Sequence, residues 1–235
     1  MKLYHGTSDK YLPKILKQGL KPRGRRNGNW KHTILSNPRA VYMTVAYPLY
    51  YSLSAVNNLK TEKGMILEID SDKLNPFKFA PDEDFLEQAT RGQEHWAEIR
   101  DMFAGEDQMN LMTAYFRDSL ETDWTDGETW RKSIKGMGNC CYFDTVPVEA
   151  ITRIAILPNI HKHIMWSDPT ITLMNFYLMG DYYKALSGMV FGDPIPEEMQ
   201  AESDELKKLT GHAKFPPPEV FSDVKVLTPQ QMEIV

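Results

Sequence analysis

A histidine, a glycine and a threonine stand in a row near the start of the chain, in the segment LYHGTS at residues 3–8. The residues before them predict a short strand over 2–5, which places these polar groups at the end of the strand. Glycine lets a ligand approach the main-chain N–H and C=O closely. Because a chain terminus usually frays, an ordered strand here needs a reason, and core packing is the alternative to a binding role.

Aromatic and cationic side chains follow this segment. The segment AVYMT (40–44) predicts a strand that carries Tyr42, and the predicted helix 48–59 carries the pair Tyr50 and Tyr51. Between them, KPRGRRNGNWKH (21–32) has two glycines, a proline and no apolar periodicity, which predicts a loop. The stretch between Lys10 and Lys60 contains many basic residues and no Asp or Glu. The chain as a whole nevertheless has a net charge of −5. This distribution favours a site for a phosphate-bearing ligand, and a solvated basic face is the alternative.

Other polar clusters give weaker predictions. Cys140 and Cys141 are adjacent, so we interpret them as core-strand residues and not as a disulfide or a metal knuckle. The histidines of HKH (161–163) have no third ligand in view, which makes a metal site improbable. The acidic residues at 82–84 are interpreted as the negative start of a helix, where they complement its dipole, and not as paired catalytic carboxylates.

The elements that would position these groups alternate over the first seventy or so residues. Strands are expected at 2–5, 40–44 and 64–70, and helices at YLPKILKQGL (11–20) and 48–59. The first helix would start at a cap near Ser8 or Asp9 and end at Gly19 in a left-handed conformation. NCCYFDTVPVEAITRIAIL (139–157) predicts two closing strands separated by a turn at Pro147.

The domain organisation follows from these periodicities. We expect one α+β domain over 1–157 that contains a helical insertion over 82–135. Residues 158–235 would form a C-terminal helix at 169–192 and a Pro-rich, acidic tail on the same domain. No apolar run approaches the roughly 18 to 20 residues of a membrane span, and no signal region follows Met1, so we expect no membrane partner and a cytoplasmic protein.

A set of short segments carries a resemblance to a known family: LYHGTS, ILKQGLKP, AVYMT, YYSLSA and GMILEID. Together they resemble the NAD-dependent ADP-ribosyltransferases of the poly(ADP-ribose) polymerase and diphtheria-toxin type. These enzymes share a His-Gly-Ser/Thr strand, an Ile-Leu-x-x-Gly-Leu helix and a Tyr-hydrophobic-Thr/Ala strand. The resemblance implies an ADP-ribosyltransferase-like split mixed β-sheet core and NAD as co-substrate. The helical insertion and the C-terminal tail fall outside it.

The resemblance also implies roles for individual residues. His5 would contact ribose hydroxyls of NAD, while Gly6 and Thr7 would hold the nicotinamide amide. Arg23 and Arg26, in the basic segment, would bind the pyrophosphate of NAD. These groups would orient the dinucleotide and would not transfer protons.

Tyr42 and Tyr51, or Tyr50 in its place, would sandwich the nicotinamide ring. The family commonly has a catalytic glutamate at the start of a late strand, where this chain has Asn139. Asparagine can bond a ribose hydroxyl but cannot act as a carboxylate base, which favours single transfer over chain formation. Asp144 or Glu149 are nearby carboxylates that could substitute.

The resemblance therefore implies a mono-ADP-ribosyltransferase with His5, Tyr42 and Asn139 at the reaction centre. The acceptor would be a protein or a nucleic acid, because RGRRNGNWK (23–31) also suits a phosphate backbone with one stacked base. The size and the basic loop would suit a toxin-like or phage effector acting in the host cytoplasm. The alternatives are a non-catalytic NAD- or ADP-ribose-binding or partner-binding module, and an enzyme resembling the RNA 2′-phosphotransferases.

Overall fold

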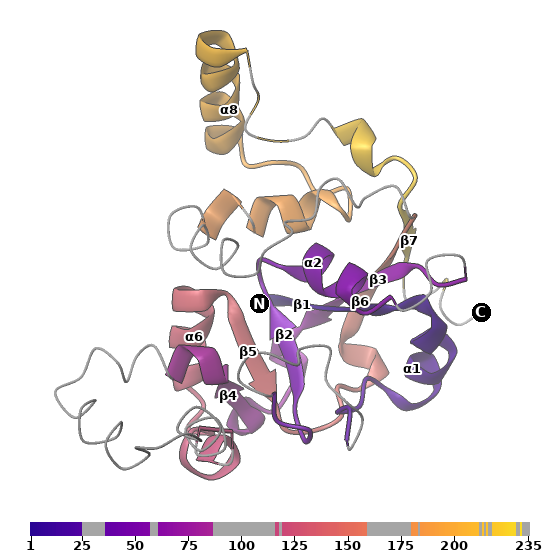
Figure 1. Cartoon of the computed structure of the whole chain (residues 1–235), viewed down its shortest axis with the longest axis vertical. Helices are drawn as coiled ribbons and strands as arrows, with labels where there is room; N and C mark the ends of the chain where they lie inside the picture. The colour runs from indigo at the N-terminus through magenta and orange to yellow at the C-terminus, as the bar shows by residue number, and fades with distance from the viewer. Residues whose placement is uncertain are drawn as a thin grey trace, which may run out of the picture. The chain divides into compact units, whose positions relative to one another are not determined.

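The structure is a computed structural model that describes residues 1–24, 36–56, 61–86, 116–158 and 180–231, apart from residues 118, 183, 212, 214, 216, 217, 229 and 230. It is a mixed α+β structure (Figure 1). Its strands are β1 (Lys2–Ser8), β2 (Val41–Thr44), β3 (Gly64–Asp70), β4 (Phe79–Pro81), β5 (Asn139–Tyr142), β6 (Ile151–Leu157) and β7 (Lys225–Leu227). The α-helices with complete bounds within the described residues are α1 (Leu12–Gln18), α2 (Pro48–Ser54), α6 (Thr129–Met137) and α8 (Glu197–Thr210).

The strands follow the order β4-β5-β2-β1-β3-β6-β7 in a 7-stranded sheet. The pairs β2/β5, β4/β5, β3/β6 and β6/β7 are all antiparallel. The chain divides into two compact units, and each is assembled from segments that are far apart in the sequence. The first unit comprises Met1, 14–44 and 70–150, and the second comprises 2–13, 45–69 and 151–235. The expected boundary near residue 157 stays a prediction.

The first unit contains β4, β5 and β2, with α6 packed beside β4 and β5 (Figure 1). Phe79 of β4 stacks on Trp130 of α6, with ring centroids 4.3 Å apart and an interplanar angle of 18°. Both side chains are buried. Helix α6 ends at Gly138, whose φ of 78° lies in the left-handed region that favours glycine. This turn leads directly into Asn139 at the start of β5.

The second unit contains β1, β3, β6 and β7, with α2 packed on β1. Its core is apolar and includes the buried side chains of Ile66 on β3 and Leu157 on β6. Leu49 and Leu53 of α2 pack into the same core, as do Phe191 and other residues of the C-terminal segment. The C-terminal segment is therefore part of the core of this unit.

Several expected elements are confirmed. β3 spans the predicted residues, α1 is followed by Gly19 with a φ of 74°, and the late strands flank the turn that contains Pro147. β1 is longer than predicted because it continues through the His-Gly-Thr triplet to Ser8. The start of the first helix differs, since a 3-10 turn over Asp9–Tyr11 comes before α1 and the side chain of Ser8 makes no cap bond.

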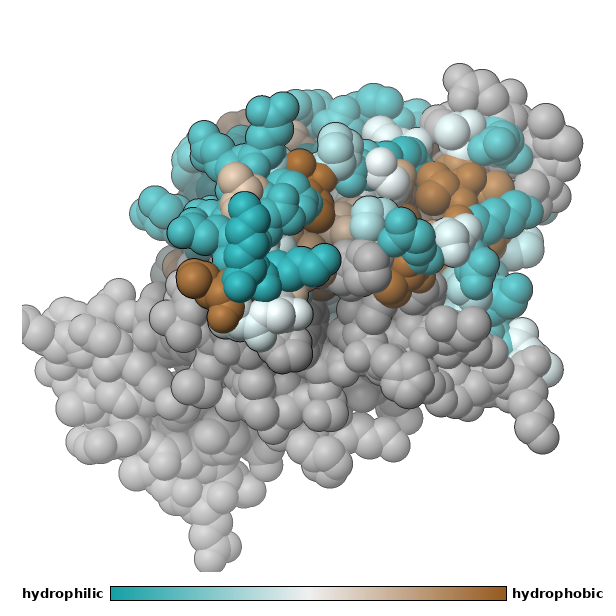
Figure 2. All heavy atoms as spheres, turned by 90° about the horizontal axis from the view of Figure 1, so that it is seen from above, coloured by the Kyte–Doolittle hydropathy of each residue, from teal (hydrophilic) through white to brown (hydrophobic). Residues whose placement is uncertain are grey.

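The tail contains two elements that the sequence did not predict. α8 lies in the acidic stretch, and β7 pairs with β6 through Val226 opposite Ala155. The helix expected over 169–192 lies partly outside the described residues, which include helical positions 184–189. Figure 2 shows one face of the molecule, on which hydrophilic residues predominate and apolar ones form small separate groups.

Candidate functional site

The His-Gly-Thr triplet lies within β1, under helix α2. His5 and Gly6 are partly exposed, whereas Thr7 and the following Ser8 are buried. A Cβ placed on Gly6 would lie 2.3 Å from the backbone nitrogen of Ser52 and 2.6 Å from the carbonyl oxygen of Pro48. Only glycine permits this approach, so the close packing of α2 on β1 already requires a glycine at this position.

The aromatic pair of α2 belongs to a group of three tyrosines. The ring of Tyr51 meets Tyr50 edge-on at 5.7 Å between centroids and Tyr47 at 6.4 Å. Tyr47 is buried, while Tyr50 and Tyr51 remain partly exposed. The main chain of Tyr51 also passes next to Gly6, since its carbonyl carbon would lie 2.8 Å from the added Cβ. The fold thus brings the tyrosine pair and the His-Gly-Thr triplet together in one unit.

Hydrogen bonds fix the end of β1 to the chain that leads into β3. The hydroxyl of Ser8 donates to the Glu62 carboxylate at 3.1 Å, and the Lys10 ammonium group bonds both oxygens of the same carboxylate at 3.1 Å. Asp9 exchanges two bonds with the backbone of Lys63. Ser8 is buried, so its bond to Glu62 lies largely out of solvent. The triplet is therefore held by helix α2 along its length and by these contacts at its C-terminal end.

Tyr42 and Asn139 lie on one face of the first unit's sheet. Tyr42 is opposite Cys141 and Thr44 is opposite Asn139 in the antiparallel β2/β5 pair. Since alternate residues of a strand share a face, Tyr42, Thr44, Cys141 and Asn139 point to the same side. Asn139 is buried, and Tyr42 is partly exposed.

The hydroxyl group of Tyr42 is anchored inside this unit. It donates a hydrogen bond to the carboxyl group of Glu83, which also accepts the backbone N–H of Asn37 at 2.8 Å. Burial, reinforced by the nearby Glu83 carboxyl, raises the pKa of Tyr42 well above its usual value. Tyr42 is therefore a hydrogen-bonding and packing group at neutral pH, and it is not a proton donor to solvent.

The acidic residues after β4 are only partly as predicted. Asp82 does start a short helical turn, because its side chain accepts the N–H of Asp84 and its carbonyl accepts the N–H of Phe85. Glu83 is instead buried, with 2% of its surface exposed. Nothing local to the sequence signals this burial, because the partners of Glu83 come from residues 37 and 42.

Burial raises the pKa of the Asp82 carboxyl to about 7, and the adjacent Glu83 adds to this effect. Burial likewise raises the pKa of Glu83 to about 7, although the bond from Tyr42 opposes the shift. Burial also raises the pKa of the thiols of Cys140 and Cys141, which keeps both thiols protonated and unreactive. The prediction of core-strand cysteines is confirmed, since both are buried and free.

A buried serine links the segment that carries Asp82 and Glu83 to Asn139. The Ser133 hydroxyl of α6 accepts the backbone N–H of Asp82 at 3.0 Å and donates to the carbonyl of Asn139 at 2.8 Å. In the neighbouring strand, the Thr44 hydroxyl donates to the carbonyl of Gly138 at 3.0 Å. The main chain at Asn139 is thus held from both sides of β5.

The carboxylates considered as substitutes for the family glutamate lie elsewhere. Asp144 follows the far end of β5, is exposed, and forms an ion pair with Lys78. A rise of about 3.3 Å per strand residue puts it well over 10 Å along the chain from Asn139. Asp144 and the exposed Glu149 line a shallow surface pocket with Lys17, Lys73 and other residues.

The basic residues are only partly described. The Arg23 guanidinium donates to the carbonyl of Ser36 at 2.6 Å, and the N–H of Gly24 donates to the carbonyl of Pro38 at 2.9 Å. Residues 23 and 24 are therefore hydrogen-bonded to the main chain at residues 36 and 38. Arg26 lies outside the described residues, as do the histidines at 161 and 163.

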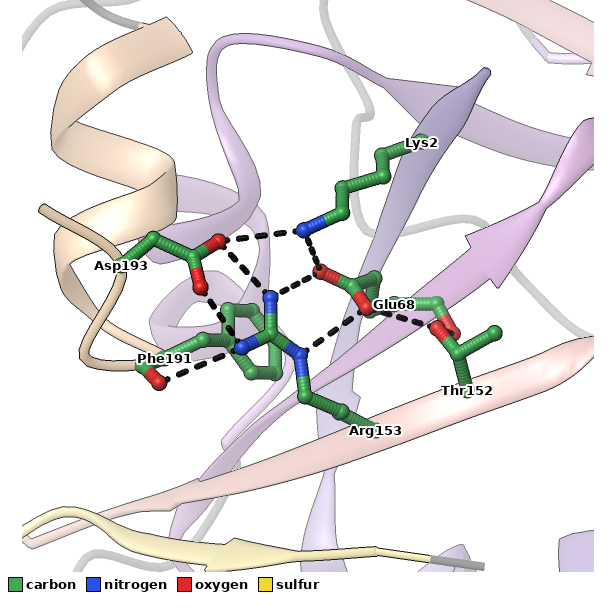
Figure 3. A network of polar contacts seen from close by, with 6 residues as sticks. All are labelled: Lys2, Glu68, Thr152, Arg153, Phe191 and Asp193. Carbon is green, nitrogen blue, oxygen red and sulfur yellow. Dashed lines mark hydrogen bonds and ion pairs between the residues drawn. The ribbon is translucent and has the colours of Figure 1, made fainter. Parts of the chain in front are cut away.

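A second polar network braces the sheet of the second unit (Figure 3). Arg153 of β6 lies between two carboxylates, and bonds Glu68 of β3 on one side and Asp193 on the other. Lys2 of β1 bonds both acids, at 3.3 and 3.2 Å. Burial alone would raise the pKa of Glu68, yet the bonds from Arg153 and Thr152 lower it below its usual range. This network ties β1, β3, β6 and the C-terminal segment together.

Comparison with protein-family models gives no match, and neither curated proteins nor solved structures give a significant one. The described residues contain no group of three or more His, Cys, Asp or Glu side chains placed to hold a metal ion. None of the helices within the described ranges has the length and apolar character to cross a membrane.

Proposed function

We propose that this chain is an NAD-dependent mono-ADP-ribosyltransferase with an ADP-ribosyltransferase-like fold. The observation that carries the proposal is the packing of Gly6 against the α2 backbone next to Tyr51. Two segments that resemble the family, the His-Gly-Thr strand and the tyrosine helix, are separated by more than forty residues yet are adjacent in the second unit. Two other predicted site residues, Tyr42 and Asn139, share one face in the first unit.

In the proposed reaction, NAD is held by His5 at a ribose and by Gly6 and Thr7 at the nicotinamide amide. The bond between the nicotinamide nitrogen and C1′ of the ribose breaks, and nicotinamide leaves as a neutral group with the bonding electron pair. The ribose passes through an oxocarbenium-like state. A nucleophile of the protein or nucleic-acid acceptor then bonds to C1′ and loses its proton to solvent or to a base on the acceptor.

Asn139 limits this chemistry. Its amide can hydrogen-bond a ribose hydroxyl, but it supplies no negative charge and accepts no proton at neutral pH. The carboxyl groups of Asp82 and Glu83, in the segment that Ser133 links to Asn139, have raised pKa values. Transfer of a single ADP-ribose is therefore the activity that we propose.

The test is to incubate the protein with NAD and to measure released nicotinamide by chromatography. His5→Ala is expected to lower release at least tenfold while its thermal unfolding stays close to that of the wild type. Glu198→Ala, on the exposed α8, is the matched control and is expected to behave like the wild type. A wild-type protein that binds no NAD and releases no nicotinamide contradicts the proposal.

A non-catalytic NAD- or ADP-ribose-binding module is the second candidate, and the neutral Asn139 favours it. Isothermal titration calorimetry with NAD separates the two candidates. Binding that depends on His5 without any release of nicotinamide identifies a binding module, whereas binding with release identifies the enzyme.

A further inference from the structure

Glu83 lies where three separate segments of the first unit meet, and the proposed function assigns it no role. We propose that Glu83 is a positioning residue, whose carboxyl group orients the ring of Tyr42 and fastens residues 36–38 to β2. The inference rests on the proposed function to the extent that Tyr42 is taken to stack on nicotinamide. It adds a residue that does not itself touch NAD.

The contacts of Glu83 support this role. The same carboxyl oxygen accepts the hydroxyl of Tyr42 and the backbone N–H of Asn37. The Asn37 N–H is also shared with the Tyr42 hydroxyl oxygen, at 2.5 Å, so the three groups form one closed set of bonds. The ring of Tyr42 packs against the apolar cluster that includes Phe116 and Leu120, so one end of the side chain is fixed while the ring stays partly exposed. The hydrogen bond at the hydroxyl fixes the direction of the side-chain axis, and packing against the cluster limits rotation of the ring about that axis. A ring held in this way is suited to stacking on a flat ligand.

Asn37 extends the anchor in two further directions. Its side-chain N–H donates to the carbonyl of Arg117 at 2.8 Å, and its side-chain oxygen accepts the N–H of Arg39 at 2.9 Å. Asn37 is 2% exposed, so these bonds are made in a water-poor environment where leaving one unmade is costly. Loss of the bond to Glu83 would therefore loosen a residue that joins several parts of the unit.

The same short stretch is bonded to residues 23 and 24. Ser36 and Pro38 accept hydrogen bonds from Arg23 and Gly24, on either side of Asn37 in sequence. Through Asn37, Glu83 connects these bonds to Tyr42. One carboxyl group thus fixes two features to each other, the proposed nicotinamide-stacking ring and the stretch 36–38 to which Arg23 and Gly24 are bonded.

The surroundings of Glu83 explain why a neutral acceptor can replace it. Tyr42 of β2 and Cys141 of β5 face it, and Asp82 and Asp84 adjoin it in sequence. No cationic side chain bonds to Glu83 within the part of the chain that the structure describes. A glutamine at this position keeps the accepting oxygen without placing a charge in this acidic environment.

The test compares Glu83→Ala, Glu83→Gln and Tyr42→Phe in two measurements. Hydrogen exchange of the backbone amides of residues 36–42 reports on how firmly residues 36–38 are held on β2, and it can be measured whether or not the protein is active. NAD kinetics report on positioning through KM and kcat. We expect Glu83→Ala to speed exchange about tenfold or more and to raise KM about tenfold, consistent with loss of one or two buried hydrogen bonds. Glu83→Gln should restore both quantities to near the wild-type values.

Tyr42→Phe should raise KM as Glu83→Ala does but leave exchange at Asn37 slow, because Glu83 still accepts that N–H. Exchange and KM that are unchanged in Glu83→Ala overturn the inference, and so does a Glu83→Gln variant that behaves like Glu83→Ala. A wild-type protein that neither binds nor cleaves NAD contradicts the proposed function instead. Exchange in that case still decides whether Glu83 fastens residues 36–38.

Discussion

Replacing Gly6 with alanine adds one methyl group at the point where strand β1 meets helix α2. The new carbon would lie 2.3 Å from the nitrogen of Ser52, 2.6 Å from the oxygen of Pro48 and 2.8 Å from the carbonyl carbon of Tyr51. Non-bonded heavy atoms favour separations of about 3.5–4.0 Å. All three obstructing atoms are main-chain atoms, so no rotamer change relieves the overlap and the helix itself must withdraw by about 1 Å.

The cost of this withdrawal can be estimated from the structure. Overpacking a well-packed site costs typically about 1–3 kcal/mol, and the upper part of this range applies where rigid backbone is the obstacle. Moving α2 also loosens Leu49 and Leu53, which are buried in the core of the second unit. We therefore expect Gly6→Ala to lower the free energy of unfolding by about 3 kcal/mol.

Equilibrium unfolding in urea measures this loss. With a denaturant slope of about 2–3 kcal/mol/M, the midpoint should fall by about 1 M. Gly64→Ala is the matched control, because it meets the same helix but only through side-chain atoms of Leu53 and Ser52, at 3.1 and 3.2 Å. These side chains can shift, so we expect a loss of about 1 kcal/mol or less.

The comparison also separates packing from ligand binding at this position. A Gly6→Ala protein that is as stable as the wild type, or no less stable than Gly64→Ala, would refute the reasoning. In that case the glycine would be explained by the needs of a ligand and not by the approach of α2.

Three further predictions concern the polar groups of the two units. Ser133→Ala removes the hydroxyl that bridges Asp82 and Asn139. It should lower the free energy of unfolding, measured in urea, by about 1–3 kcal/mol. An unchanged free energy of unfolding would show that water replaces the hydroxyl. Arg153→Met leaves the buried Glu68 carboxylate with only Lys2 as a cationic partner, and should cost about 3 kcal/mol in the same assay; a loss under 1 kcal/mol would contradict the role of the network. The raised pKa of Glu83 means that folding takes up a proton, so its contribution to stability is present below its unfolded pKa of about 4.3 and is lost as the pH rises through about 7. Urea unfolding at pH 5 and pH 8 should therefore show a larger fall for the wild type than for Glu83→Gln, and equal falls would argue against a buried, titrating Glu83.

Much of the local structure was readable from the sequence. Gly64–Asp70 is a strand because its apolar and β-branched residues suit a position that is buried on both faces. Gly19 ends the first helix as predicted, because its positive φ value costs other residues more. β7 was not predicted because three residues form a strand only when a partner such as β6 pairs with them.

The predicted site residues show the same contrast between local sequence patterns and contacts made by distant segments. The sequence by itself determined the short motifs that resemble the family, namely the His-Gly-Thr triplet and the tyrosines, together with Asn139, because residue types and local periodicity are properties of neighbouring positions. Only the tertiary structure decided that Gly6 faces the α2 backbone, since that close approach joins positions more than forty residues apart. It likewise decided that Glu83 is buried against Tyr42 and Asn37. Burial and hydrogen-bond pairing depend on contacts between distant segments, and these contacts exist only once the chain has folded.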